Sequence, residues 1–275
     1  ESAASSRAID EQVRTLTTEA RALYEIDVAR LVELRPDLIL TQAQCDVCAV
    51  RYEDVVSAVR NTPELHGTEI LALNPQSIHD VLDDVERVAQ AVGEEAALYR
   101  ALAFKTLRSM RLNARQREVA DIDSNHLPRV VCLEWIDPPM VAANWMPELV
   151  ELAGGQSGLS RPGVHSTYAD WQAIVDYDPQ VIVIMPCGFD LARAIDEAQV
   201  LPGFPGWHAM SAVRQQRVYA ADGNAYFNRS GPRLIDSLAI LSHLVQPKLF
   251  PEPADETAAR AWRRLETRDG ALEPA

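Results

Sequence analysis

The sequence is poor in several features that mark common protein classes. Its 275 residues contain only four cysteines, too few for the disulfide framework of a small secreted scaffold. No apolar run approaches the roughly 20 residues that a membrane-spanning helix needs. Basic residues are outnumbered, with 26 Lys and Arg against 40 Asp and Glu and a net charge of -14. This balance argues against nucleic acid and anionic membranes as partners, because both select Lys- and Arg-rich faces.

Motifs of catalysis are also missing. The sequence contains no GxSxG, HExxH, P-loop or clean GxGxxG motif, and Gly154-Gly155 is better interpreted as the end of a helix. The carboxylates are numerous but form no identifiable catalytic pair. The sequence therefore predicts a protein that is not an enzyme.

A repeated unit indicates that the chain forms two lobes. Residues 27–40 and 170–183 align without gaps, 143 residues apart (170 minus 27). Each copy begins with an aspartate and continues with a short amphipathic pattern. A proline, Pro36 or Pro179, then ends the helix, and the apolar run that follows is typical of a strand buried on both faces.

The elements after each copy correspond as well. Residues 68–74 predict a strand, and residues 78–92 predict a helix with apolar side chains at steps of three and four. Residues 217–222 and 235–244 predict the same pair in the second half. We therefore expect an α/β fold of two Rossmann-like lobes with mostly parallel sheets.

The stretch between the halves predicts the boundaries of these units. Residues 93–123 lack proline and carry an apolar stripe, so they predict one long helix that joins the lobes. Residues 129–135 predict the opening strand of the second lobe, and the counterpart of this strand would precede Glu1, so we expect an N-terminally truncated first lobe. The expected units are an incomplete N-terminal lobe (1–92) with a partly helical leading segment, the connecting helix (93–123), a C-terminal lobe (124–250) and a polar tail (251–275).

Unusual residues follow the predicted strands, at the edge where open parallel sheets bind ligands. Cys45 and Cys48 form a CxxC after the strand of the first repeat copy, and Cys187 follows the strand of the second. Three thiols that converge would suit Zn(II), Cu(I) or the upper axial position of a cobalt corrin. The alternative is that all three are small residues in turns. Cys132, between two apolar residues, is predicted to belong to the core.

Aromatic and polar residues from the same segments complete the candidate site. Tryptophan faces would stack on a large planar ligand, although packing within the lobe is the alternative. An imidazole would bind a metal or form surface hydrogen bonds, and the polar residues would bind ligand amides or satisfy a structured turn. The candidate contacts are Cys45, Glu134, Trp135, Trp145, His165, Cys187, Phe189, Asn224, Tyr226, Asn228 and Arg229.

Three longer segments carry a resemblance to a known family. EWIDPPMVAANWMPELVELAGG (134–155), PQVIVIMPCGFD (179–190) and DGNAYFNRSGPR (222–233), with the order of the lobes, resemble the cobalamin-binding proteins of the helical-backbone solute-binding superfamily. That superfamily serves ABC importers of corrinoids, siderophores, haem and metal ions. The resemblance implies a corrinoid or related metal chelate between the lobes, an importer permease as partner, and a periplasmic or cell-surface location. The aromatic residues that clamp the corrin in the first lobe of that family are not matched here, where the CxxC stands instead.

Two other functions stay open. One is a cytosolic metal- or thiol-handling protein, possibly an enzyme, that uses Cys45, Cys48 and Cys187 with a soft metal ion. The other is an enzyme of chelatase type on the same architecture. A signal peptide or lipobox upstream of Glu1 would favour transport, whereas a plain start would favour the cytoplasm. Exposed apolar surface on the truncated lobe predicts a monomer or a weak dimer through that lobe.

Overall fold

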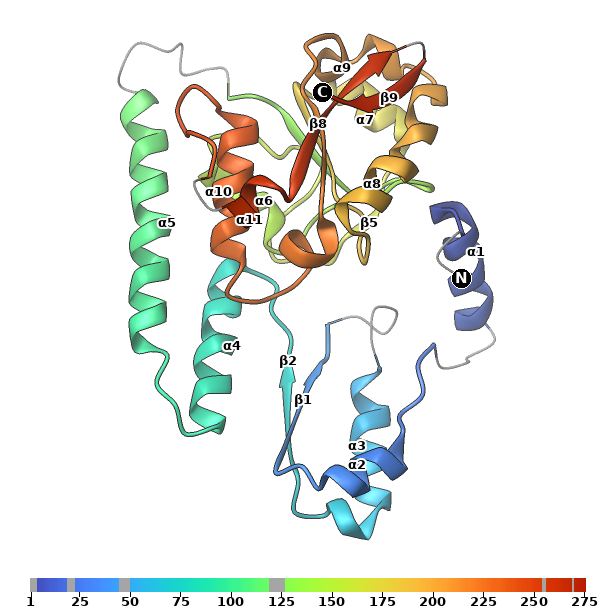
Figure 1. The fold of residues 1–275 in the computed structure, drawn as a ribbon, viewed down its shortest axis with the longest axis vertical. Helices are drawn as coiled ribbons and strands as arrows, with labels where there is room; N and C mark the ends of the chain where they lie inside the picture. The colour runs from blue at the N-terminus through green and yellow to red at the C-terminus, as the bar shows by residue number, and fades with distance from the viewer. Residues whose placement is uncertain (1–3, 19–22, 45–49, 119–126, 254–255, 269) are drawn as a thin grey trace.

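The structure is a computed structural model that describes residues 4–18, 23–44, 50–118, 127–253, 256–268 and 270–275 (Figure 1). These residues form two α/β lobes with a pair of long helices beside them. No helix within these ranges combines the length and the apolar character needed to cross a membrane. The two-lobed α/β fold predicted from the repeat is confirmed.

The N-terminal lobe is small and thinly covered. Its described elements are α1 (Ser6–Thr18), α2 (Val28–Leu34), β1 (Leu38–Gln42), α3 (Tyr52–Asn61), the 3-10 turn η1 (Pro63–Leu65) and β2 (Glu69–Leu73). β1 and β2 pair in parallel. Both strands stay partly accessible, and Leu40 in the centre of β1 is 47% exposed. The apolar strands of this lobe are therefore much less buried than those of the other lobe.

The sequence repeat appears in the structure residue for residue. α7 (Trp171–Tyr177) has the same length as α2, and 143 residues separate their first residues (171 minus 28). Asp27 and Asp170 each cap the helix that follows by accepting a backbone N–H. Arg35 and Asp178 end these helices in the left-handed conformation, with φ of 44° and 47°. The same local signals have built the same helix–turn–strand unit twice.

The C-terminal lobe is built around a mixed sheet. Among the described residues this sheet has seven strands in the order β5-β4-β3-β6-β7-β8-β9. Only β3, β6 and β7 are parallel to one another, whereas the outer strands pair antiparallel. The expected mostly parallel arrangement therefore holds for the centre of the sheet alone. The strands are β3 (Val130–Trp135), β4 (Met140–Val141), β5 (Thr167–Tyr168), β6 (Val181–Ile184), β7 (Val218–Ala221), β8 (Trp262–Arg268) and β9 (Ala271–Pro274).

Helices cover both faces of this sheet and bury the three central strands. α6 (Met146–Leu152) and α10 (Leu234–Val245) pack on one face, where Leu149 and Leu241 are fully buried. The other face is covered by α7, α8 (Leu191–Glu197) and α9 (Ser211–Arg214), with Trp207 at its centre. The remaining elements are η2 (Ala198–Gly203), η3 (Trp207–Ala209), the π-helical turn η4 (Gly223–Phe227) and α11 (Glu256–Ala259). Burial on both faces explains why these strands read as continuous apolar runs.

The C-terminal segment is not the polar tail that the sequence predicts from residue 251 onward, because part of it forms two strands of the sheet. β8 pairs antiparallel with β7, and β9 pairs with β8. Leu265 and Leu272 are buried, and Trp262 packs edge-on against Tyr219 with ring centroids 5.8 Å apart. A hairpin at the edge of a sheet buries few side chains, so most of its residues are charged or polar. The sequence of these strands therefore lacks the apolar alternation that predicts a strand.

The connection between the lobes is a helical pair, not one helix. α4 (Ile78–Ala91) runs antiparallel to α5 (Ala97–Glu118) (Figure 1). Arg100 of α5 binds Asp83 and Glu86 of α4 at 2.5 and 2.6 Å. Ile78 of α4 also joins the buried core of the C-terminal lobe. The pair is therefore anchored to the C-terminal lobe, which leaves it little freedom as a hinge.

Candidate functional site

Three loops meet where the parallel strands of the C-terminal lobe end, on the side that faces the N-terminal lobe (Figure 1). We call this surface the interlobe face, formed by residues 134–139 at the end of β3 and beyond it, 185–190 after β6 and 222–233 after β7. Backbone hydrogen bonds join the loops: Cys187 N donates to Glu134 O over 3.0 Å, and Asn224 N donates to Phe189 O over 3.0 Å. The three segments thus form one continuous surface, as the topology predicts.

Gly223 makes the closest approach between two of these loops. A Cβ atom at this position would lie 2.4 Å from the carbonyl oxygen of Pro186 and 2.5 Å from that of Met185. Beside it, the side-chain amide of Asn228 donates to Met185 O over 2.8 Å. Only glycine fits here, and the amide of Asn228 is already used in joining the loops. Asn228 therefore has a structural role, and its predicted contact with a ligand stays a prediction.

Aromatic rings lie next to the joined loops. Trp135 and Phe189 pack at 57° with ring centroids 5.3 Å apart. The Arg193 guanidinium lies 3.8 Å from the centroid of the Phe189 ring. Phe189 is buried, whereas Trp135 remains partly accessible. Trp135 is therefore the aromatic surface that this face offers, with Phe189 supporting it from beneath.

Glu134 places a carboxyl group at the same edge. Ser166 Oγ donates to Glu134 Oε2 over 2.6 Å and accepts a hydrogen bond from Ala143 N over 2.9 Å. Burial raises the pKa of Glu134, and the hydrogen bond from Ser166 and the nearby His165 offset only part of that rise. The carboxyl group therefore takes up a proton more readily than an ordinary glutamate and then acts as a hydrogen-bond donor.

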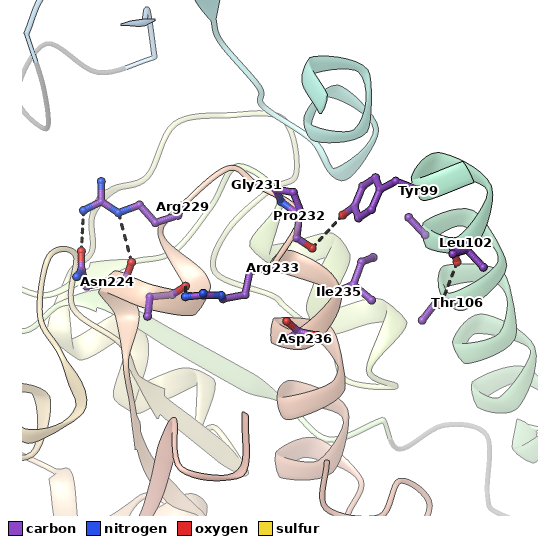
Figure 2. Close-up of a pocket in the computed structure, with 12 residues that line it drawn as sticks. Tyr99, Leu102, Thr106, Asn224, Arg229, Gly231, Pro232, Arg233, Ile235 and Asp236 are labelled. Atoms are coloured by element: carbon purple, nitrogen blue, oxygen red, sulfur yellow. Dashed lines mark hydrogen bonds between the residues drawn. The ribbon is translucent and has the colours of Figure 1, made fainter. Parts of the chain in front are cut away.

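A groove of about 930 Å³ adjoins the loop after β7 (Figure 2). One wall is α5, from which the Tyr99 hydroxyl donates to Pro232 O over 2.9 Å. On the other wall, Arg229 donates to Asn224 Oδ1 over 2.6 Å. Arg233 also lines the groove, where it donates to Ala225 O. The Asn224 and Arg229 pair predicted from sequence thus lies where the interlobe face meets this groove.

Two predicted contacts are wrong because their side chains belong to the core. Trp145 is 4% exposed, and its indole N–H donates to Phe227 O over 3.0 Å. Tyr226 is 5% exposed and packs in the same apolar cluster. Both follow strands in sequence, but the turns that start α6 and η4 direct them inward.

Of the three predicted metal ligands, the structure describes only Cys187. Cys45 and Cys48 lie outside the described residues. Cys187 is partly accessible on the interlobe face, and His165 is exposed in the loop before β5. Within the described part of the chain, no three His, Cys, Asp or Glu residues form a group that would hold a metal ion. Cys132 belongs to the core as predicted, and burial raises its pKa to about 12.

Sequence reasoning missed three residues beside the aromatic pair. Asp137, Tyr168 and Arg193 all contact the N-terminal segment next to Trp135. A signal existed for two of them. Asp137 is in the same strand-end segment as Trp135, and Arg193 lies one helical turn after Phe189, on the same side of the chain.

Comparisons with known proteins agree with this architecture. An uncharacterised ABC transporter substrate-binding lipoprotein of Bacillus subtilis, YvrC, is 24% identical over 233 residues, which are 82% of this chain and 67% of the relative. A periplasmic haem-binding protein from Pseudomonas aeruginosa superposes with a TM-score of 0.62 at 18% identity, over 82% of this chain and 77% of that one. The periplasmic vitamin B12-binding protein BtuF of Vibrio cholerae gives a TM-score of 0.59 at 20% identity, over 82% and 81% of the two chains.

A family model described as periplasmic binding protein matches residues 4–225. The match extends from the N-terminal segment to the start of the loop after β7, so it includes the first two loops of the interlobe face and residues 222–225 of the third. Because this is well over half of the chain, the protein belongs to the periplasmic binding protein family, whose members bind substrates for transport and are not enzymes.

Proposed function

We propose that this protein is the substrate-binding component of an ABC importer and that its ligand is a corrinoid such as cobalamin, or a related metal chelate. The observation that carries the proposal is the Trp135–Phe189 pair, which presents an indole on the interlobe face. An indole supported from beneath stacks on a planar tetrapyrrole with little loss of side-chain entropy. Haem and vitamin B12 are the ligands named for two structural neighbours.

The polar groups around the indole favour a corrinoid over haem. Glu134, with its raised pKa, donates a hydrogen bond when protonated, and Asn224, on the loop after β7, carries a side-chain amide that already pairs with Arg229. The amide side chains of a corrin both donate and accept hydrogen bonds, so they match Glu134 in either protonation state, whereas its ionised form would repel the carboxylates of haem. Arg229 is exposed at the same edge and would bind acidic or amide groups at the rim.

The proposed partner is the membrane permease of the importer, and the proposed location is periplasmic or on the cell surface. The relative from Bacillus subtilis is named as a substrate-binding lipoprotein, which supports this assignment. Because α4 is anchored in the C-terminal lobe by Ile78, we expect capture with small closure. The thiol-handling alternative is less favoured, because the family match and the relative named as a transporter substrate-binding lipoprotein both support a role in transport.

The experiment is a titration of the full chain with hydroxocobalamin and, separately, with haemin. We expect hydroxocobalamin to bind with micromolar or better affinity, about -8 kcal/mol, and more tightly than haemin. Trp135→Ala should weaken binding by roughly tenfold or more. Trp171→Ala is the matched control, since Trp171 is also partly accessible but packs against Phe204 and Trp207, outside the interlobe face. Absence of any spectral or calorimetric change with either ligand would refute the proposal.

A second variant tests the thiol. If Cys187 is the upper axial ligand of the cobalt, Cys187→Ser should shift the visible spectrum of bound hydroxocobalamin, because sulfur and water ligands differ in field strength. An unchanged spectrum with unchanged affinity would return Cys187 to the role of a small residue in a turn. Cys132→Ser is unsuitable as a control because Cys132 is buried, so Ser230→Ala in the loop after β7 serves instead.

A further inference from the structure

The helix α1 packs against the C-terminal lobe beside the aromatic pair. In Figure 1 it lies beside β5 and α8, away from the strands of the N-terminal lobe. One part of this contact involves Trp135, whose indole N–H donates to Ser6 O over 3.3 Å. Ser6 N in turn donates to Glu197 of α8 over 2.5 Å. α1 therefore takes up the polar edge of the indole that the proposed ligand would contact.

Ion pairs and hydrogen bonds from charged residues of α1 also hold this helix close to the indole. Arg7 binds the carboxylate of Asp137 through two hydrogen bonds of 2.8 and 3.0 Å. One turn further along, Asp10 accepts a hydrogen bond from the Tyr168 hydroxyl, and Arg14 lies 4.7 Å from the centroid of the Tyr168 ring. These contacts fix α1 over the segment that links β3 to β5.

A third contact reaches the support of the indole. Arg193 donates to Ala4 O over 3.0 Å while its guanidinium lies over the Phe189 ring. The same arginine therefore touches both the ring beneath Trp135 and the chain that covers it. Displacing α1 would release Arg193 at the interlobe face, where its cation would be available to a ligand.

The contact is polar rather than apolar. The buried residues of α1 are Ser6 and Asp10, and its apolar residues Ile9, Val13 and Leu16 remain partly accessible. Arg7 is 65% exposed within its ion pair. Exposed ion pairs are individually weak and are screened by salt. A helix held in this way is able to detach without unfolding the lobe beneath it.

We propose that α1 is a detachable cover of the ligand site, which occupies the indole of Trp135 in the ligand-free protein and is displaced when the ligand binds. This inference rests on the proposed function, because it takes the Trp135 surface as the place where the ligand binds. A competing cover lowers the apparent affinity by the fraction of time for which the site is open. A cover closed for about nine tenths of the time weakens binding by about tenfold.

The test uses a charge reversal and its rescue in the full chain. Arg7→Glu faces Asp137 with a like charge and should detach α1, whereas the double variant Arg7→Glu/Asp137→Arg restores an opposite pair. Arg30→Glu on α2 is the matched control, since Arg30 is an exposed arginine paired with Glu33 away from this contact. Hydrogen exchange of residues 7–18 reports docking of α1, and hydroxocobalamin titration reports competition.

We expect Arg7→Glu to speed exchange across α1 and to raise the affinity for hydroxocobalamin by several-fold, roughly three- to tenfold. The double variant should return the exchange of α1 toward that of the unmodified chain, and Arg30→Glu should change neither quantity. Hydroxocobalamin added to the unmodified chain should itself speed exchange in α1.

Three results would contradict the proposal that α1 is a detachable cover. Equal exchange in Arg7→Glu and the unmodified chain would show that the Arg7–Asp137 pair does not hold α1. Faster exchange with weaker binding would make α1 a part of the ligand site instead of its competitor. If hydroxocobalamin binds but leaves hydrogen exchange in α1 unchanged, α1 does not compete with the ligand, and the proposed function is unaffected. If no variant binds hydroxocobalamin or haemin, the proposed function fails, and acrylamide quenching of Trp135 in Arg7→Glu then decides whether α1 shields the indole.

Discussion

Replacement of Gly223 by alanine should disrupt the interlobe face more than any nearby glycine substitution. The added Cβ would lie 2.4 and 2.5 Å from two backbone carbonyl oxygens of the loop after β6, and 2.7 Å from Asn228 Nδ2. Backbone cannot rotate away as a side chain can, so the loops must separate. Separation strains the hydrogen bonds from Asn228 to Met185 O and from Asn224 to Phe189 O.

The expected cost follows from these contacts. Overpacking of a close-packed site costs about 1–3 kcal/mol, and each weakened hydrogen bond adds about 0.5–1.5 kcal/mol. We therefore expect Gly223→Ala to lower the free energy of unfolding by roughly 2–6 kcal/mol. For a chain of this size that corresponds to a fall in melting temperature of about 5–15 °C. Because the two loops carry Cys187 and Asn224, ligand binding should weaken as well.

Gly231 provides the control within the same loop. A Cβ at this position meets nothing within 4 Å, and its backbone is outside the left-handed region. Gly231→Ala should leave stability unchanged or raise it by up to about 1 kcal/mol, by restricting the unfolded chain. Urea unfolding followed by circular dichroism measures both variants. If Gly223→Ala is as stable as Gly231→Ala, the steric argument for the joined loops is wrong.

Three further predictions concern buried polar groups. Trp145→Phe removes the donor to Phe227 O and should cost about 1–3 kcal/mol in urea unfolding; an unchanged midpoint would contradict the core assignment. Glu148→Ala removes the carboxylate that accepts the N–H of Ile78 at the start of α4 over 2.8 Å. It should cost about 1 kcal/mol and speed hydrogen exchange in the first turn of α4, whereas unaltered exchange would show that the core contacts alone hold this helix. Burial raises the pKa of Glu134 in the folded protein, so the folded form keeps a proton that the unfolded form loses, and stability falls as pH rises above the ordinary glutamate range. The stability of Glu134→Gln relative to the unmodified chain should therefore increase as the pH rises above the ordinary glutamate range, near about pH 4. A difference in stability that stays constant with pH would argue against the burial effect.

The sequence alone determined the local units of this protein. The short amphipathic helices, the prolines after them and the apolar strands recur at the same spacing, and the structure reproduces them in both lobes. These features depend on neighbours within a few residues, which is why periodicity and capping predict them. Cys132 was assignable to the core for the same reason, because a small residue within an apolar run of a central strand has no route to the surface.

Only the tertiary structure decided how the units meet. Whether an aromatic residue near the end of a strand faces solvent or core depends on the turns around it. Trp135 ends β3 and stays partly accessible, whereas Trp145 precedes α6 and is buried in the core. The hairpin of β8 and β9 forms against the open edge of β7, and no feature of residues 262–274 alone predicts this pairing. The contact of α1 joins residues about 130 positions apart, such as Arg7 and Asp137. Such contacts pair charges and hydrogen-bonding groups across space, and their sequence pattern is the same as that of an ordinary solvated helix.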